Sequence, residues 1–325
     1  MIRRSAVLMA ALLLVAAAPA GWAAAGIVPL RQIAVLDLPG HVGFDEVALA
    51  RGMLLVSHPG AGSVDLFDPQ KRRIAGHIAD MSSPRGVAVD QAAHLVYIAN
   101  SGARNIVVVS SDDWQVKRLI PLEAAPDELL VVGAEQRLYV TFPAANAVGT
   151  LDLAAGKGAV ATAQIDGRPS GLAYDGGRRE LFVSVQERRT VQVLGAALKP
   201  VGSFLLNASE PTGMAFSAKY DRLYVAVRYA VLALNPETGE ELGRSAVAGG
   251  IGQLVLDEPT ASLLGIAQGS VFVVPATGTL GVASELLVDV KGHTLAYDSA
   301  TGMLYLPGGR EGRSKLLILK RVLGR

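Results

Sequence analysis

The sequence predicts an all-β fold, a seven-bladed β-propeller with four-stranded blades. The first supporting observation is a repeat. SPRGVAVDQAAHLVYIANSGARNIVVV starts at Ser83, RPSGLAYDGGRRELFVSVQERRTVQVL at Arg168 and EPTGMAFSAKYDRLYVAVRYAVLAL at Glu210. With four weaker copies, successive units are 40 to 43 residues apart, anchored at Phe44, Pro84, Pro126, Pro169, Pro211, Ile251 and Gly292. A period in the low forties with several short strands per unit is typical of propeller blades.

The second observation is that each unit contains four short apolar runs, which we name strands a to d. In the second unit they cover residues 86–90, 95–100, 105–111 and 116–122. They are rich in Val, Ile, Leu and Tyr, and Gly, Pro, Asn and Asp separate them. Several runs are almost continuously apolar, which indicates burial on both faces. We therefore expect the blades to stack around a ring, with strands a lining a central channel and strands d facing outward.

The third observation concerns the two ends of the chain. The seventh unit supplies strands a, b and c at residues 294–298, 303–307 and 315–320, and no strand d follows them. Residues 31–38 read RQIAVLDL and resemble the strand d of the second unit. We predict that this N-terminal strand completes the last blade, because such a closure removes an open sheet edge.

The N-terminal segment has the features of a secretory signal peptide. Arg3 and Arg4 form a basic start, and the apolar run Ala6–Ala18 is too short to span a membrane. We expect residues 1–25 to be removed and residues 26–325 to form one propeller domain. The preferred cleavage site is after Ala25. Cleavage after Ala23 or after Ala20 is the alternative. The Ala-rich leader predicts a bacterial periplasmic or secreted protein with no membrane span after cleavage.

Composition excludes several classes of site. The chain has no cysteine, so a thiol nucleophile, a thiolate metal site and a covalently attached c-type haem are impossible. The formal net charge is +1, so no global field attracts nucleic acid, and we expect no nucleic-acid partner. The protein is expected to be a monomer.

Repetition separates architecture from function within this one chain. An Asp follows strand a in four units, where Asp favours the a–b turn, at Asp90, Asp175, Asp257 and Asp298. A Tyr recurs in strand b, where we expect it to pack between blades, at Tyr97, Tyr139, Tyr224 and Tyr305. Residue types that recur in this way indicate structure.

Residues that break the repeat are better candidates for a binding site. The positions that follow the anchors should lie at the channel mouth, on the face of the d–a and b–c loops. Units 1 and 3 place acidic pairs there, with a basic residue between them. The candidate ligand-binding residues, including two from the b–c loop of unit 2, are Asp45, Glu46, Arg85, Asp127, Glu128, Asn100 and Arg104. They form either a polar binding funnel or a solvated ion-pair network that orders the loops.

Three of the five histidines belong to the sector where units 7 and 1 adjoin. They are His41, His58 and His293, and Glu46 and Asp45 are expected beside them. Imidazole and carboxylate together suit a first-row divalent metal, so these residues are a candidate metal site. The alternative is three unrelated surface histidines, since no short His-x-x-x-His spacing is present.

The stretch VYIANSGARNIVVVSSDDWQVKRLIPLEAAPDELLVV resembles the YVTN-type β-propeller repeat, and in particular the exported YncE-like propeller proteins. This resemblance covers all seven units and is strongest from Ser83 to Leu151. It implies a propeller outside the cytoplasm that acts as a binding or scaffold module, and it implies no catalytic residue set.

Two functions remain open. The first is a non-catalytic module that binds a protein or a small polar ligand at the channel mouth. The second is a metal-dependent lactonase or hydrolase resembling the gluconolactonase and regucalcin propellers, in which Glu, Asn and Asp converge on a divalent cation. Glu46 or Glu128 with Asn100 or Asn105 would supply part of such a set. No second Asn–Asp pair is evident, so we lean against an enzyme.

Overall fold

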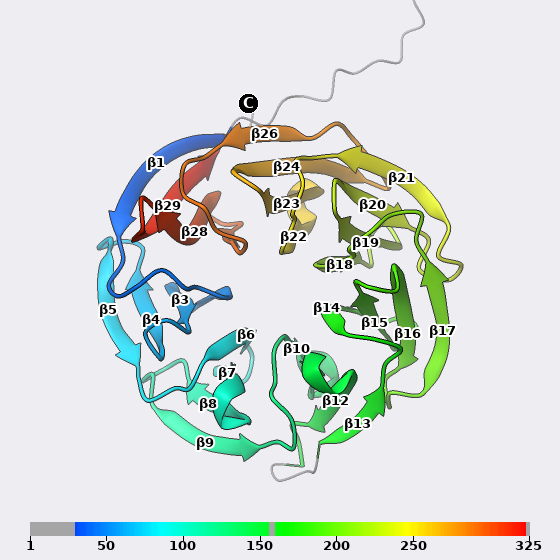
Figure 1. Ribbon diagram of the computed structural model, residues 1–325, viewed down its shortest axis with the longest axis horizontal. Helices are drawn as coiled ribbons and strands as arrows, with labels where there is room; N and C mark the ends of the chain where they lie inside the picture. Colours follow the sequence, from blue (N-terminus) through cyan, green and yellow to red (C-terminus); the bar gives the residue numbers. More distant parts are fainter. Residues whose placement is uncertain (1–29, 156–159, 323–325) are drawn as a thin grey trace, which may run out of the picture.

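The computed structural model describes residues 30–155 and 160–322, and within them the chain forms seven antiparallel sheets arranged in a ring (Figure 1). The predicted seven-bladed propeller with four-stranded blades is confirmed. The expected signal peptide, residues 1–25, lies outside the described residues. No helix in the described part of the chain has the length and apolar character needed to cross a membrane.

Strands a to d run from the channel outward in every blade (Figure 1). Blade 1 contains β2 (Val47–Ala50), β3 (Met53–His58), β4 (Ser63–Asp68) and β5 (Arg73–Ile78). Blade 2 contains β6 (Pro84–Asp90), β7 (Leu95–Asn100), β8 (Asn105–Ser110) and β9 (Val116–Pro121). Blade 3 contains β10 (Leu129–Val132), β11 (Arg137–Phe142), β12 (Ala147–Asp152) and β13 (Ala161–Gln164).

The remaining blades follow the same order. Blade 4 contains β14 (Pro169–Asp175), β15 (Glu180–Val185), β16 (Thr190–Gly195) and β17 (Pro200–Leu205). Blade 5 contains β18 (Met214–Ser217), β19 (Arg222–Val227), β20 (Ala230–Leu234) and β21 (Glu241–Ala246). Blade 6 contains β22 (Leu254–Asp257), β23 (Ser262–Ala267), β24 (Ser270–Thr277) and β26 (Ser284–Leu287), and β25 (Thr279–Leu280) pairs with the far end of β24. Blade 7 contains β27 (Ala296–Asp298), β28 (Met303–Arg310), β29 (Arg313–Arg321) and β1 (Leu30–Asp37).

Short 3-10 turns occupy four of the connections in the described residues. They are η1 (Ser101–Ala103), η2 (Gly133–Glu135), η3 (Pro143–Ala145) and η4 (Glu258–Thr260). Each turn ends at a residue in the left-handed region, such as Arg104 with φ 51°. η1 and η3 lie in b–c loops, so they belong to the face of the channel mouth.

The N-terminal strand closes the ring as predicted. β1 pairs antiparallel with β29, with Arg31 opposite Lys320 and Asp37 opposite Lys315. The amide N–H of Leu38 extends the pairing by donating to the Ser314 carbonyl at 3.0 Å. Blade 7 therefore combines the two ends of the chain, and β29 has no free edge.

The core is divided among the contacts between blades. The described residues form seven buried apolar clusters, and each cluster joins two neighbouring blades. The recurring tyrosines belong to these clusters, as expected, at Tyr97, Tyr139, Tyr224 and Tyr305. A ring of seven equivalent contacts holds the strands a in place around the channel, and this frame positions the loops at the mouth.

The recurring aspartates order the opposite face. In three a–b turns, one carboxylate oxygen of the Asp accepts hydrogen bonds from the backbone N–H groups two and three residues later, at Asp90, Asp175 and Asp298. The predicted turn role is confirmed at these positions. Asp257 differs, because its carboxylate pairs with the buried Arg321 guanidinium at 3.1 Å.

Glycines at the start of strand a permit close approach between blades. A Cβ on Gly213 would lie 2.8 Å from both the Gly252 carbonyl oxygen and the Leu254 nitrogen of the next blade. We expect Gly213→Ala to lower the free energy of unfolding by about 1–3 kcal/mol, because blades 5 and 6 must separate to admit a methyl group. Chemical denaturation measures this, with Gly202→Ala as the control, since its Cβ meets nothing within 4 Å. Equal stability of the two variants would contradict the close approach.

Candidate functional site

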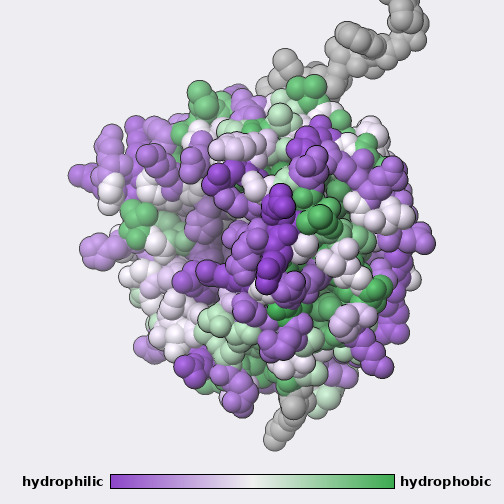
Figure 2. Space-filling view, turned by 45° about the vertical axis from the view of Figure 1, so that its right-hand side comes forward, coloured by the Kyte–Doolittle hydropathy of each residue, from purple (hydrophilic) through white to green (hydrophobic). Residues whose placement is uncertain are grey.

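A polar cavity opens at the channel mouth, where the d–a and b–c loops meet. Its volume is about 240 Å³. It is lined by residues at the entry to each of the seven blades, together with Gln186 after strand b of blade 4, namely Asp45, Glu46, Gly86, Asp127, Glu128, Ser170, Gln186, Thr212, Gly213, Gly252, Gln253, His293 and Thr294. In Figure 2, hydrophilic side chains surround the hollow near the middle of the molecule. The ring thus brings together residues that are far apart in the sequence.

Four carboxyl groups share this cavity: Asp45, Glu46, Asp127 and Glu128. Both glutamates also join neighbouring blades. Glu46 Oε2 accepts a hydrogen bond from the Val87 N–H at 2.9 Å, and Glu128 Oε1 accepts one from the Leu172 N–H at 3.2 Å. Each bond links the start of one blade to strand a of the next, so the backbone amide orients each carboxyl group.

Burial in the cavity changes how these acids ionise. Desolvation, opposed in part by the Leu172 hydrogen bond, raises the pKa of Glu128 to about 8, and the charges of Asp127 and Asp45 add to the rise. Desolvation and the charge of Glu128 likewise raise the pKa of Glu46 well above its usual range. The pKa of Asp127 is raised by burial and by Asp45. The cavity therefore concentrates more negative charge than its surroundings stabilise.

The predicted basic residue lies at the edge of the acidic group. Arg85 Nη1 donates to Asp45 Oδ2 at 2.7 Å, and the Arg85 side chain is 45% exposed. The charges of Arg85 and Arg168 oppose the rise in the pKa of Asp127. The ion-pair network considered for the mouth thus covers Arg85 and Asp45, and it leaves both glutamates without a basic partner among the described residues.

Besides Arg85, two predicted candidates are not among the residues that line the cavity. Asn100 is buried at the end of β7, where its Oδ1 accepts a hydrogen bond from the Ser82 N–H at 2.7 Å. Arg104 caps η1 on the exposed side of the same loop. Asn105, which was considered for a hydrolase set, has a buried Oδ1 with no hydrogen-bond partner in the described residues. Neither asparagine lines the cavity.

The structure does not assemble the metal site expected from His41, His58, His293 and Glu46. His293 lines the cavity, whereas the His58 ring is fully buried and both of its nitrogens already have protein partners. His41 contributes its backbone carbonyl to that contact. Across residues 30–155 and 160–322, no group of three or more His, Asp or Glu side chains is arranged to hold a metal ion. Sharing one sector was not sufficient, because His58 points into its own blade.

Some residues of the lining were not among the candidate ligand-binding residues. Gln253 stands where Glu46 and Glu128 stand in their blades, and its Oε1 accepts from the Leu295 N–H at 2.9 Å. The repeat alignment contained the signal for Gln253, because every residue at that position faces the mouth or is glycine. Gln186 follows strand b of blade 4, and no feature of the sequence singled it out.

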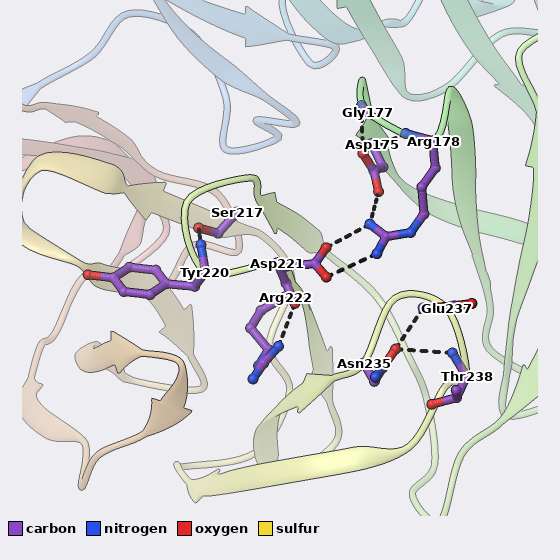
Figure 3. Close-up of polar contacts among 10 residues, drawn as sticks. All are labelled: Asp175, Gly177, Arg178, Ser217, Tyr220, Asp221, Arg222, Asn235, Glu237 and Thr238. Atoms are coloured by element: carbon purple, nitrogen blue, oxygen red, sulfur yellow. Dashed lines mark hydrogen bonds and ion pairs between the residues drawn. The ribbon is translucent and has the colours of Figure 1, made fainter.

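The opposite face carries a separate set of ion pairs. Arg178 donates to Asp175 at 2.7 Å within its own a–b turn and to Asp221 of blade 5 at 2.6 Å and 3.0 Å (Figure 3). Asn235 Oδ1 orders a neighbouring turn through the N–H groups of Glu237 and Thr238. Arg178 thus joins the a–b turn of blade 4 to the a–b turn of blade 5.

Comparison with solved structures supports the fold. A streptogramin B lyase superposes with a TM-score of 0.73 at 13% identity, covering 90% of this chain and 98% of that chain. A virginiamycin B lyase from Staphylococcus aureus superposes with a TM-score of 0.74 at 10% identity, covering 90% and 100%. No protein-family model matches the sequence, and no curated protein matches it significantly. At such low identity the likeness concerns the propeller fold.

Proposed function

We propose that the protein is an exported, non-catalytic binding module of the YVTN-type, YncE-like kind, and that it takes a small polar ligand bearing a positive charge at the channel mouth. One observation carries the proposal: Asp45, Glu46, Asp127 and Glu128 share one cavity of about 240 Å³. A cavity of that size suits a small molecule, and carboxyl groups select for ammonium or guanidinium groups. Arg85 at the rim would suit the negative end of a zwitterion.

The raised pKa values explain why a cation would be favoured. Without a ligand, the Glu128 carboxyl stays largely protonated up to pH of about 8. A bound cation stabilises the charged form, so ligand binding would release protons from the cavity. Linkage then makes affinity rise with pH until the glutamates are ionised.

We expect 1,4-diaminobutane to bind the mature protein and to bind more tightly at pH 9 than at pH 6, whereas succinate, a dianion with the same four-carbon chain, should not bind. Because the folded-state pKa of Glu128 exceeds its usual value near 4.3, its contribution to stability is complete at low pH. That contribution is lost as pH rises through about 8. The Tm of the unliganded protein should therefore fall as the pH rises from about 6 to about 8, and the diamine should restore it. Calorimetric titration and thermal unfolding measure both effects.

Two substitutions localise the binding. Asp127→Asn with Glu128→Gln should weaken diamine binding by about tenfold or more, since roughly 1.4 kcal/mol of charge attraction corresponds to that factor. Glu237→Gln on the opposite face is the matched control and should leave binding unchanged. Equal binding of diamine and succinate, or unchanged affinity in the double variant, would overturn the proposal.

A catalytic function is the second candidate. His293 lines the same cavity as Glu128, and a carboxyl group with a pKa of about 8 suits proton transfer near neutral pH. Both structural neighbours are lyases. Incubation with a streptogramin B antibiotic and chromatography of the products tests this function. Turnover that is lost in Glu128→Gln would favour the enzyme over the binding module.

A further inference from the structure

A buried histidine in blade 1 lies between two hydrogen-bond acceptors. The His58 side chain is 0% exposed. Its Nδ1 lies 3.0 Å from Asp65 Oδ2, and its Nε2 lies 2.7 Å from the His41 carbonyl oxygen. A neutral imidazole has one N–H and can donate to only one of these acceptors. With Asp65 ionised, both acceptors therefore have a donor only when the ring is doubly protonated.

The hydrogen bonds around the partner carboxyl group favour its ionised form. Asp65 is 1% exposed and receives three hydrogen bonds, from His58, from Ser63 Oγ at 3.0 Å and from His77 Nδ1 at 2.8 Å. Burial raises the pKa of Asp65, but the hydrogen bonds from His58 and His77 outweigh it, and the net pKa is lowered. Burial alone would lower the pKa of His58, but the bonds to Asp65 and His41 reverse this and leave it raised.

The His58 ring holds the segment that leads from β1 into blade 1. Besides binding the His41 carbonyl, it packs against the Phe44 ring, with centroids 4.4 Å apart. Asp45 and Glu46 follow directly and line the cavity at the mouth. The same segment makes backbone hydrogen bonds from the Asp45 N–H to the Ser57 carbonyl at 3.0 Å and from the Gly60 N–H to the Gly43 carbonyl at 3.3 Å.

We propose that His58 is a pH-operated latch, whose imidazolium fastens residues 41–46 against blade 1 and thereby positions the acidic side of the channel mouth. When the ring loses a proton, the charge-assisted bond to Asp65 retains the remaining N–H on Nδ1. The Nε2 lone pair then faces the lone pairs of the His41 carbonyl, so that contact becomes repulsive. Residues 41–46 are released, and Asp45 and Glu46 lose their fixed positions.

The ionisable groups around the ring are few. β4 presents Asp65, and β5 presents His77, which reaches the ring only through Asp65. The segment before β2 presents a backbone carbonyl, because His41 contacts the ring through its main chain. Of these groups, His58 itself is the one whose proton decides whether the His41 carbonyl has a donor. The latch rests on this geometry. Its release at high pH would oppose the gain in cation affinity from ionisation of Glu128, and this effect on affinity rests on the function proposed above.

The test is an NMR titration of the unliganded mature protein from pH 6 to pH 10. The His58 ring resonances should titrate with a midpoint above the ordinary value near 6.5. Hydrogen-exchange protection factors of the Asp45 and Gly60 amides should fall about tenfold or more over the same pH interval. Asp65→Asn removes the carboxylate charge and should move both midpoints to lower pH. His94→Gln, a partly exposed histidine paired with Asp112 at 3.0 Å, is the control and should move neither.

A His58 ring that titrates at or below the ordinary value would overturn the latch, and so would protection factors that stay constant while the ring titrates. The wild-type titration decides the matter even if Asp65→Asn does not fold. Because no ligand is used, failure of diamine binding at the mouth would leave this result intact, and the two proposals can fail separately.

Discussion

A protein that lacks residues 31–38 is expected to aggregate or to unfold about 10 °C or more below the intact protein. The deletion removes the outermost strand of blade 7 and exposes the whole edge of β29. An unpaired edge of nine residues is a template for association with other chains. Ring closure depends on blade 7, so the loss affects its contacts with both neighbouring blades.

The packing of β1 explains the size of this effect. Ile33, Ala34 and Leu36 pack against the core between blades 7 and 1, and Val35 packs against the core between blades 6 and 7. Burying one large apolar side chain fully contributes about 1.5–3 kcal/mol, so losing several partly buried ones removes several kcal/mol. A chain of this size loses roughly 2–4 °C in Tm per kcal/mol.

Thermal unfolding and light scattering measure the outcome. Asp37→Asn is the control, because it removes the charge of a side chain that is 79% exposed, and with it the ion pair to Lys315, and should change the Tm little. An intact Tm in the deletion variant would show that blade 7 is stable with three strands, and the closure would then have no energetic role.

Much of this fold could be predicted from the sequence, because the information is periodic. The strands of blade 2 were expected at residues 86–90, 95–100, 105–111 and 116–122, and β6 to β9 lie within two residues of those bounds. The closure could be predicted by elimination, since the seventh unit lacked a strand d and only residues 31–38 resembled one. The repeats reveal the strands because every blade packs against two neighbours in the same way, so the same apolar pattern recurs in each unit.

The site was less accessible to such reasoning. The acidic pairs at the mouth could be identified, because Asp45, Glu46, Asp127 and Glu128 break a repeat that is otherwise small or polar. The hydrogen bonds that Glu46 and Glu128 make to the next blade could not, since they depend on how closely blades approach. His58 shows the same limit. Its place at the end of β3 suggested a metal ligand in the b–c loop, but its ring points toward Asp65. The repeat pattern does not predict this orientation of the side chain.

The second large effect is expected at the other end of the chain. Arg321→Met should lower the free energy of unfolding by about 3–5 kcal/mol, the usual cost of leaving one partner of a buried ion pair uncompensated. The Arg321 and Asp257 side chains are 2% and 1% exposed, and they join β29 of blade 7 to β22 of blade 6. The guanidinium also donates to Thr260 Oγ1 at 2.6 Å and to Ser262 Oγ at 2.7 Å.

The pair matters as a unit. In Arg321→Met, the Asp257 carboxylate keeps its hydrogen bond from Ser299 Oγ at 2.7 Å but loses its only cation among the described residues. Replacing both partners removes that buried charge. The double variant Arg321→Met with Asp257→Leu should therefore be more stable than Arg321→Met alone, as found where apolar side chains replace buried ion pairs of similar volume.

Denaturant titration of the single and double variants measures the difference, with Arg310→Met as the control. Arg310 pairs with Asp289 at 3.1 Å, but both side chains are about half exposed, so its loss should cost no more than about 1 kcal/mol. If Arg321→Met is as mild as Arg310→Met, the buried pair contributes nothing to the contact between blades 6 and 7. If instead the double variant is less stable than Arg321→Met alone, the ion pair itself stabilises the contact of blade 7 with blade 6, and the uncompensated Asp257 carboxylate is not the cause of the loss.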